Sequence, residues 1–226
     1  MWSTYLGGSN EDTPIGISAH DGVVSVLGAT NSVDFPLFKP NPVAPIPLNS
    51  HWLSKFEYDG QVLFSSYLVI KNLFFNFNRK NTIIQHNGYT AITGYILAGT
   101  PYPITQTPAP VLNDDEFSIF SIIYNDQNKE HYSTQYNNEN IGRAIDVDFD
   151  GDMLCILSTQ QGSSGFNTPG AHKDTAAPNI NETHLYCVDV PKADVKFASY
   201  ANLTNHSKLP SDVEIYNNEV LSLIHI

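Results

Sequence analysis

An internal repeat with a period of about 65 residues constrains this chain more than any other feature. A tight turn that leads into a strand recurs four times at nearly even spacing. The turns are Asp21-Gly22, Asn87-Gly88, Asp150-Gly151 and Asn217-Asn218. An aromatic residue followed by two small ones repeats with them, at Trp2, Phe64, Tyr132 and Phe197. A regular period of this kind indicates one supersecondary unit that is stacked several times.

Each repeat is predicted to form four β-strands. Short apolar runs alternate with polar residues at period two, and Gly, Asn, Asp and Pro separate them, which is typical of an all-β chain. The only helix-like stretch, 69–80, is too short and too rich in Asn to be called a helix. A repeated four-stranded antiparallel meander predicts a β-propeller. The predicted blades are 14–68, 81–136, 142–201 and a partial blade 211–226.

The predicted propeller is a single, incomplete domain over residues 1–226, with about three and a half blades, whereas closed propellers have roughly four to eight. In one interpretation the orphan strand 2–6 closes the fourth blade. The preferred interpretation is a fragment of a larger propeller. The tail 221–226 also reads as the translation of a transposase end used in sequencing libraries, so it is excluded from functional inference; the alternative is an ordinary strand.

The first repeat resembles the SBBP, or bacterial β-propeller, repeat family. The resemblance rests on Trp2-Ser3-Thr4-Tyr5-Leu6-Gly7-Gly8, Asp21-Gly22-Val23-Val24-Ser25-Val26-Leu27-Gly28-Ala29-Thr30 and Asp34-Phe35-Pro36. The third repeat adds Phe166-Asn167-Thr168-Pro169-Gly170-Ala171. Such repeats occur in large secreted or surface proteins, many from the Bacteroidetes. The resemblance implies a secreted or cell-surface interaction scaffold and no catalytic residues, because the motif is structural.

Composition excludes several classes of function. The formal net charge of −12 argues against nucleic-acid binding, which needs a basic surface, and against electrostatic docking on anionic lipid. No apolar run approaches the roughly 18 residues that would predict membrane insertion. The N-terminus carries no signal-peptide pattern. Aromatic residues make up 12% of the chain and charged residues only 15%, which predicts a folded protein.

The densest candidate chemistry is the acidic run Asp146 to Asp152. Asp148, Asp150 and Asp152 are candidate Ca²⁺ ligands, because alternating carboxylates around a Gly turn can surround this ion. The favoured interpretation is an acidic hairpin turn without a cofactor, because no Glu follows at the EF-hand spacing. Cys155 and Cys187 are expected to be buried free thiols, although they lie on neighbouring strands and pairing stays open.

No sequence motif predicts an enzyme. Nucleophile elbows, zinc-type ligand spacing and phosphate-binding loops are all missing from the sequence. The long loops are the expected binding face, and Phe35, Phe38, Tyr102 and Phe166 lie in them. The recurring aromatics Phe35, Tyr102 and Phe166 are expected to pin the loops rather than to bind a ligand. The predicted function is therefore a non-catalytic adhesion scaffold for protein or glycan; the alternatives are a structural spacer and a carbohydrate-active enzyme.

Overall fold

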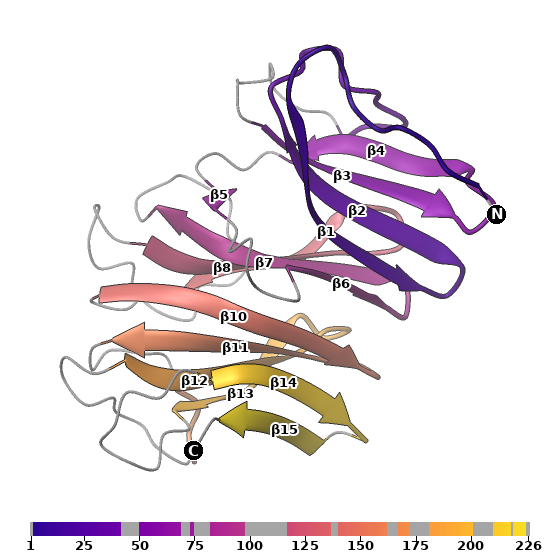
Figure 1. Ribbon diagram of the computed structural model, residues 1–226. Coiled ribbons are helices and arrows are strands. Elements are labelled where there is room, and N and C mark those ends of the chain that lie inside the picture. The colour runs from indigo at the N-terminus through magenta and orange to yellow at the C-terminus, as the bar shows by residue number, and fades with distance from the viewer. Residues whose placement is uncertain are drawn as a thin grey trace.

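A computed structural model describes residues 2–41, 50–68, 73–74, 82–97, 117–136, 140–161, 167–171, 181–200, 210–217 and 219–224 (Figure 1). These residues form strands joined by turns and irregular segments, and no helix occurs among them. In this described part, therefore, no helix is long and apolar enough to cross a membrane. The predicted all-β class is confirmed.

The first and third repeats each form a four-stranded antiparallel sheet in chain order. Sheet 1 contains β1 (Asp12–His20), β2 (Val23–Thr30), β3 (Ser50–Glu57) and β4 (Val62–Leu68). Sheet 3 contains β10 (Asn140–Asp150), β11 (Met153–Gln161), β12 (Asn181–Asp189) and β13 (Asp194–Tyr200). The predicted four-stranded meander is thus confirmed for these two repeats.

The second repeat carries one additional short strand, and the last repeat is represented by a hairpin. Sheet 2 contains β5 (Leu73–Phe74), β6 (Ile83–His86), β7 (Tyr89–Leu97), β8 (Phe117–Tyr124) and β9 (Glu130–Tyr136). Both β5 and β6 pair with β7. Sheet 4 contains β14 (Pro210–Tyr216) and β15 (Glu219–Ile224). Among the described residues, the four sheets do not close into a ring (Figure 1).

Two-residue hairpins start every repeat, and their positive φ angles explain their composition. Asp21 and Gly22 have φ of 50° and 81°, and Asn87 and Gly88 have 48° and 79°, a region that Gly and Asn tolerate. In the third repeat the expected turn pair Asp150-Gly151 is wrong by one position. Asp150 still pairs with Met153, so Gly151 and Asp152 form the turn. This correction makes the spacing of the turns along the chain more even than the sequence pattern indicated.

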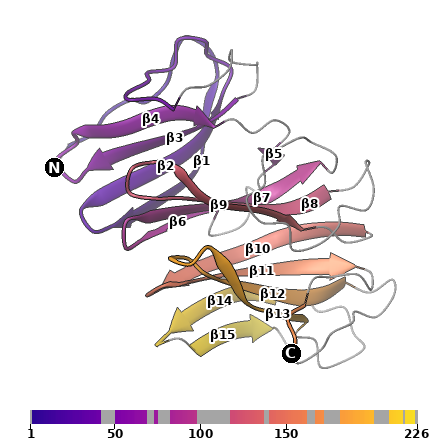
Figure 2. The same ribbon diagram turned by 180° about the vertical axis from the view of Figure 1, so that it is seen from behind.

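The sheets stack face to face, and each interface buries an apolar core (Figures 1 and 2). The core between sheets 1 and 2 includes Leu27, Leu53, Ile83 and Phe120. The next two cores lie between sheets 2 and 3 and between sheets 3 and 4. Ile83 packs against sheet 1, whereas its neighbour Ile84 packs toward sheet 3. Burial of both faces explains the apolar residues at adjacent positions in these strands.

Both ends of the chain depart from simple expectation. The orphan strand predicted at 2–6 is wrong, because these residues form no strand. Instead, the Trp2 indole N–H donates to the Tyr58 carbonyl at 2.7 Å, and the Trp2 ring lies 5.7 Å from Phe56. Aromatic packing on sheet 1 thus takes the place of strand pairing. At the other end β15 extends to Ile224, into the tail 221–226; the alternating apolar pattern of that tail suits a strand whatever its origin.

Candidate functional site

The two ends of the stacked sheets differ strongly in the length of their connections. Short hairpin turns occupy one end, and longer connections leave from the other (Figure 1). The connections between the second and third strands of sheets 1, 2 and 3 run over 31–49, 98–116 and 162–180, and all three have the same length. Because function concentrates on long loops held by a rigid scaffold, this connection end is the candidate binding face.

One predicted loop aromatic is pinned to the sheet. Phe35 is buried and stacks on Trp52 with a centroid distance of 4.7 Å, which confirms its predicted anchoring role. Phe38 is partly exposed, at 41%. Tyr102 and Phe166 lie outside the described residues, so their predicted roles stay predictions. Phe38 lies beside the middle of β4, where it forms a bridge with Ser65.

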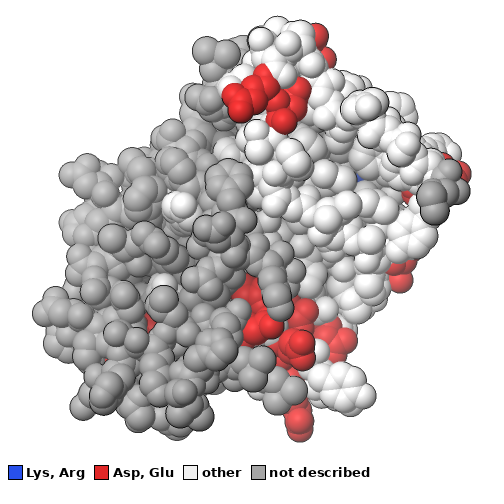
Figure 3. Space-filling view, in the orientation of Figure 1, with Lys and Arg blue, Asp and Glu red and all other residues white. Residues whose placement is uncertain are grey.

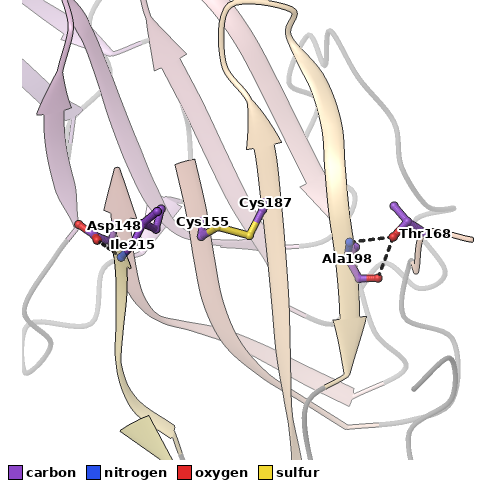
Figure 4. The surroundings of a disulfide bond; sticks show 6 residues. All are labelled: Asp148, Cys155, Thr168, Cys187, Ala198 and Ile215. Atoms are coloured by element: carbon purple, nitrogen blue, oxygen red, sulfur yellow. Dashed lines mark hydrogen bonds between the residues drawn. A yellow bond between two sulfur atoms is a disulfide. The ribbon is translucent and has the colours of Figure 1, made fainter. Parts of the chain in front are cut away.

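Equivalent positions on the outer strands of sheets 1 and 3 anchor two of the three long connections. Phe38 exchanges two backbone hydrogen bonds with Ser65 of β4, at 3.0 and 2.8 Å. Thr168 contacts Ala198 of β13, and its hydroxyl oxygen accepts the Ala198 N–H at 3.1 Å (Figure 4). Ser65 and Ala198 occupy the same place in their sheets. The described parts of these two connections therefore fold back onto the outer strands of their own sheets.

The acidic run predicted as a possible cation site is a ladder of backbone acceptors. One carboxylate oxygen of Asp146, Asp148 and Asp150 accepts the N–H of Val213, Ile215 and Asn217, at 3.1, 2.6 and 3.2 Å. Figure 4 shows the central contact, and Figure 3 shows acidic side chains gathered over β10 and β14. Antiparallel strands leave every second N–H of an edge strand unpaired, and the alternating carboxylates satisfy these donors.

The candidate Ca²⁺ ligands are only partly brought together. Asp148 and Asp150 each direct one oxygen to a β14 amide, and Asp152 lies in the exposed turn. No group of three or more His, Cys, Asp or Glu side chains is arranged for a metal within the described residues. His20 and His86 hold equivalent positions before their hairpin turns, and their rings lie 4.4 Å apart with a tilt of 49°. The preference for an acidic turn over a calcium site stays a prediction.

The Asp146 carboxyl is the most strongly perturbed acid in the ladder. It is only 2% exposed, and burial together with its hydrogen bond to the Asp212 carboxyl raises the pKa of Asp146 to about 7. The two carboxyl groups can form this bond only when one of them is protonated. Such a pair has acid–base character, but burial keeps Asp146 away from a substrate. Its role is therefore confined to the contact between sheets 3 and 4.

Cys155 and Cys187 form a disulfide, so the expected free thiols are wrong. They are direct cross-strand partners on β11 and β12, with Cα atoms 4.1 Å apart (Figure 4). Both side chains are buried in the core between sheets 3 and 4. The two cysteines pair because they lie directly opposite each other on β11 and β12, and the sequence did not reveal this register. Disulfides persist mainly in oxidising compartments.

A groove missed by sequence reasoning lies on the face of sheet 1 that points away from sheet 2. Its volume is about 280 Å³, and its walls include Trp2, Ile17, Trp52 and Phe56. Two wall residues, Trp52 and Asp12, each carry a buried polar atom, Nε1 and Oδ1, without a hydrogen-bond partner. Ile17, 69% exposed, lies on β1, whose pairing is irregular between Pro14 and Gly16, and no sequence pattern marked this face as open.

Comparison with known proteins adds no family assignment, because no protein-family model and no curated protein matches the sequence. The resemblance to the SBBP repeat therefore stays a prediction based on the quoted motifs. What the chain does has to be inferred from its own geometry.

Proposed function

We propose that the chain is part of a β-propeller that serves as a non-catalytic, secreted or cell-surface scaffold and binds protein or glycan at its connection end. The observation that carries this proposal is the long connection of constant length, repeated at the same end of three stacked sheets. Connections of one length but different sequence would present different binding surfaces on the same framework of strands. Loops longer than about 12–15 residues are uncommon in compact domains, and binding residues are concentrated on loops that a rigid scaffold positions.

Stacked antiparallel sheets with the same strand order support the propeller part of the proposal. Sheets 1 and 3 share the order of first to fourth strand, and each sheet packs on the next one along the chain. The first strands of neighbouring sheets also lie together, since β10 contacts both β6 and β14. Stacking of this kind, with the first strands side by side, is what neighbouring propeller blades require, and it supports this part of the proposal.

The disulfide supports the extracellular part of the proposal. A buried cross-strand Cys155–Cys187 bond is expected in a protein that matures in an oxidising compartment. Lysing source cells directly into denaturant that contains N-ethylmaleimide, before any reduction, measures the state of this pair, because unfolding exposes both buried cysteines to the reagent. Intact mass without adducts is expected, and two adducts per chain would contradict an extracellular location.

The binding function is tested with the whole chain on an array of defined glycans and a panel of matrix glycoproteins. In the decisive variant, residues 98–116 are replaced by the sequence of residues 31–49, which has the same length. We expect this exchange to abolish or redirect binding to any probe that the wild type retains. The control replaces the hairpin Asn87-Gly88 with Asp-Gly and should leave binding unchanged. The proposal would be contradicted if the wild type retained no probe. It would also be contradicted if binding stayed unchanged after each of the three connections had been exchanged in turn.

A further inference from the structure

The junction between sheets 1 and 2 brings two histidines together at the end that carries the hairpin turns. His20 is the last residue of β1, and His86 is the last residue of β6. Their rings have centroids 4.4 Å apart and an interplanar angle of 49°. Each ring belongs to a different repeat, and the two strands that carry them lie side by side. The histidine pair is therefore part of an internal junction of the chain.

Hydrogen bonds beside the pair hold the two strands in place. The Gln85 N–H donates to the Ser18 hydroxyl at 2.9 Å, and the Gln85 side-chain amide donates to the His20 carbonyl at 3.2 Å. The His86 ring also lies 5.3 Å from the Phe149 ring of sheet 3. Both imidazoles are thus positioned by packed strands, which is the condition for a site whose geometry exists before a ligand binds.

A carboxylate orients the His20 ring. Its Nδ1 lies 2.9 Å from the Asp21 Oδ2. An imidazole in this position carries its proton on Nδ1 and leaves the lone pair of Nε2 free, as in the carboxylate–histidine pairs that support metal ions. The side chain of His20 is 34% exposed, and His86 is also partly exposed. An ion and its bound water can therefore reach the pair from solvent.

The separation of the two rings selects the kind of ion. Two imidazoles that bind one ion at a right angle, with metal–nitrogen distances of about 2.1 Å, have ring centres about 4.5 Å apart. A tetrahedral angle moves the ring centres to about 5.3 Å. The observed 4.4 Å matches the right angle. Cu²⁺ and Ni²⁺ take this angle in square-planar or tetragonal coordination, whereas structural Zn²⁺ is almost always tetrahedral.

We propose that His20 and His86 form a two-histidine site for Cu²⁺ or Ni²⁺ that links sheets 1 and 2, with water completing the coordination sphere. Asp21 is a positioning residue that holds the His20 ring. With two protein ligands the site is open and exchanges its ion, unlike a closed structural site with four. It lies at the end of the sheets opposite the connection end, so it goes beyond the proposed binding function and does not depend on it.

The test is calorimetric titration of the whole, untagged chain with NiCl₂ and, separately, with CuCl₂. We expect one ion per chain and tighter binding of Cu²⁺ than of Ni²⁺. His20→Asn and His86→Asn should each weaken binding at least about tenfold, because each removes one of the two ligands. Asp21→Asn should cost less than the loss of either ligand. The matched control is His131→Asn, which changes a partly exposed histidine outside the pair and should leave binding unchanged.

Two further measurements keep the proposal falsifiable if a variant folds poorly. The electron paramagnetic resonance spectrum of the wild-type Cu²⁺ complex should show splitting from two nitrogen ligands. NiCl₂ should raise the melting temperature of the wild type but not of either histidine variant, because the ion binds the folded junction. The proposal would be overturned by a wild type that binds neither ion. It would also be overturned if only one histidine variant lost binding, since a single imidazole would then hold the ion.

Discussion

The junction between sheets 1 and 2 and the junction between sheets 3 and 4 share one geometry but use different chemistry. In the first, the neutral Ser18 hydroxyl accepts the Gln85 N–H. In the second, the Asp148 carboxylate accepts the Ile215 N–H at the equivalent place. Both acceptors meet an N–H that the pairing within the hairpin leaves free, and one acceptor is neutral while the other is charged, so this contact does not depend on charge.

The two junctions also differ in the side chains of one cross-strand pair, which lies on the second and third strands of sheets 1 and 3. The disulfide of sheet 3 joins Cys155 and Cys187, whose counterparts in sheet 1 are Ser25 and Lys55. Ser25 hydrogen-bonds Gln85 across the junction, and Lys55 is only 5% exposed. One junction therefore contains a covalent link at the place where the other buries a lysine. The difference shows that the repeat conserves backbone geometry and varies the source of stability.

The largest effect is expected from removing the disulfide. The Cys155→Ala/Cys187→Ala variant should lose about 3–4 kcal/mol of unfolding free energy, because a cross-link over 32 residues restricts the unfolded chain. Urea unfolding followed by tryptophan fluorescence measures the change. Wild type with dithiothreitol is the control and should approach the variant. Equal midpoints for oxidised wild type and variant would show that this junction does not depend on its covalent link.

Replacing the buried lysine should raise the unfolding free energy, whereas removing the disulfide should lower it. Burial lowers the pKa of Lys55 to about 8, so the folded state binds fewer protons than the unfolded state between pH 8 and 10.5. Stability should therefore rise with pH across this window. Lys55→Met should raise the unfolding free energy at pH 7 by up to about 3 kcal/mol and abolish the alkaline rise.

Urea midpoints at pH 7, 8, 9 and 10 check this expectation, with the exposed Lys129→Met as the control. An unchanged pH profile in Lys55→Met would show that the ammonium group reaches solvent. A large loss of stability in the same variant would show that Lys55 is a structural partner in the first junction.

Removing the equivalent acceptors compares the two junctions directly. Asp148→Ala should cost about 1.5–3 kcal/mol and Ser18→Ala about 0.5–1.5 kcal/mol, because charged acceptors form stronger hydrogen bonds. Thermal unfolding of both variants at pH 7 gives the difference. Asp148→Asn, which retains an acceptor oxygen, should recover most of the loss. Equal costs for the two alanine variants would mean that charge adds nothing at this position.

A smaller effect than that of Asp148→Ala is expected from the carboxyl pair of Asp146 and Asp212. The raised pKa of Asp146 means that the folded state holds an extra proton between about pH 4 and 7, so stability present at low pH is lost as pH rises through 7. Asp146→Asn can accept the Val213 N–H and donate to Asp212 at every pH. We expect it to be more stable than wild type at pH 8 by about 1–2 kcal/mol, a figure reduced because the half-buried Asp212 is screened by solvent.

Urea unfolding of wild type and Asp146→Asn at pH 4, 6 and 8 separates the two proteins. Their midpoints should diverge as pH rises. Parallel profiles would show that the pair does not share a proton in the folded state.

Much of the fold was predictable because local rules create it. Turn residues, period-two alternation and a fixed repeat length placed the ends of the first and third predicted blades, 14–68 and 142–201, within about two residues of the ends of sheets 1 and 3. The anchoring role of Phe35 also followed from its recurring place. The connection end was found as a candidate face, but its Tyr102 and Phe166 lie outside the described residues.

Contacts between sheets escaped prediction because they depend on register. The Asp150-Gly151 turn was misplaced by one position, since Asp150 is the last residue of β10 and accepts the Asn217 N–H. The alternating acids carried a usable signal: each lies 67 residues before its partner, close to the repeat length. That coincidence of spacing indicates contact between repeats rather than a cation loop.

The sequence by itself determined the all-β class, the four-stranded unit and its repetition, because turn chemistry and side-chain alternation act over short stretches of chain. Only the tertiary structure decided that Cys155 meets Cys187, that the acids of β10 serve β14, and that residues 2–6 pack through Trp2 instead of pairing as a strand. It also decided that Ile17 lies in the open while Ile83, at the same place in the repeat, is buried. The physical reason is that burial depends on which surface lies opposite, and that surface belongs to a neighbouring sheet a whole repeat away along the chain.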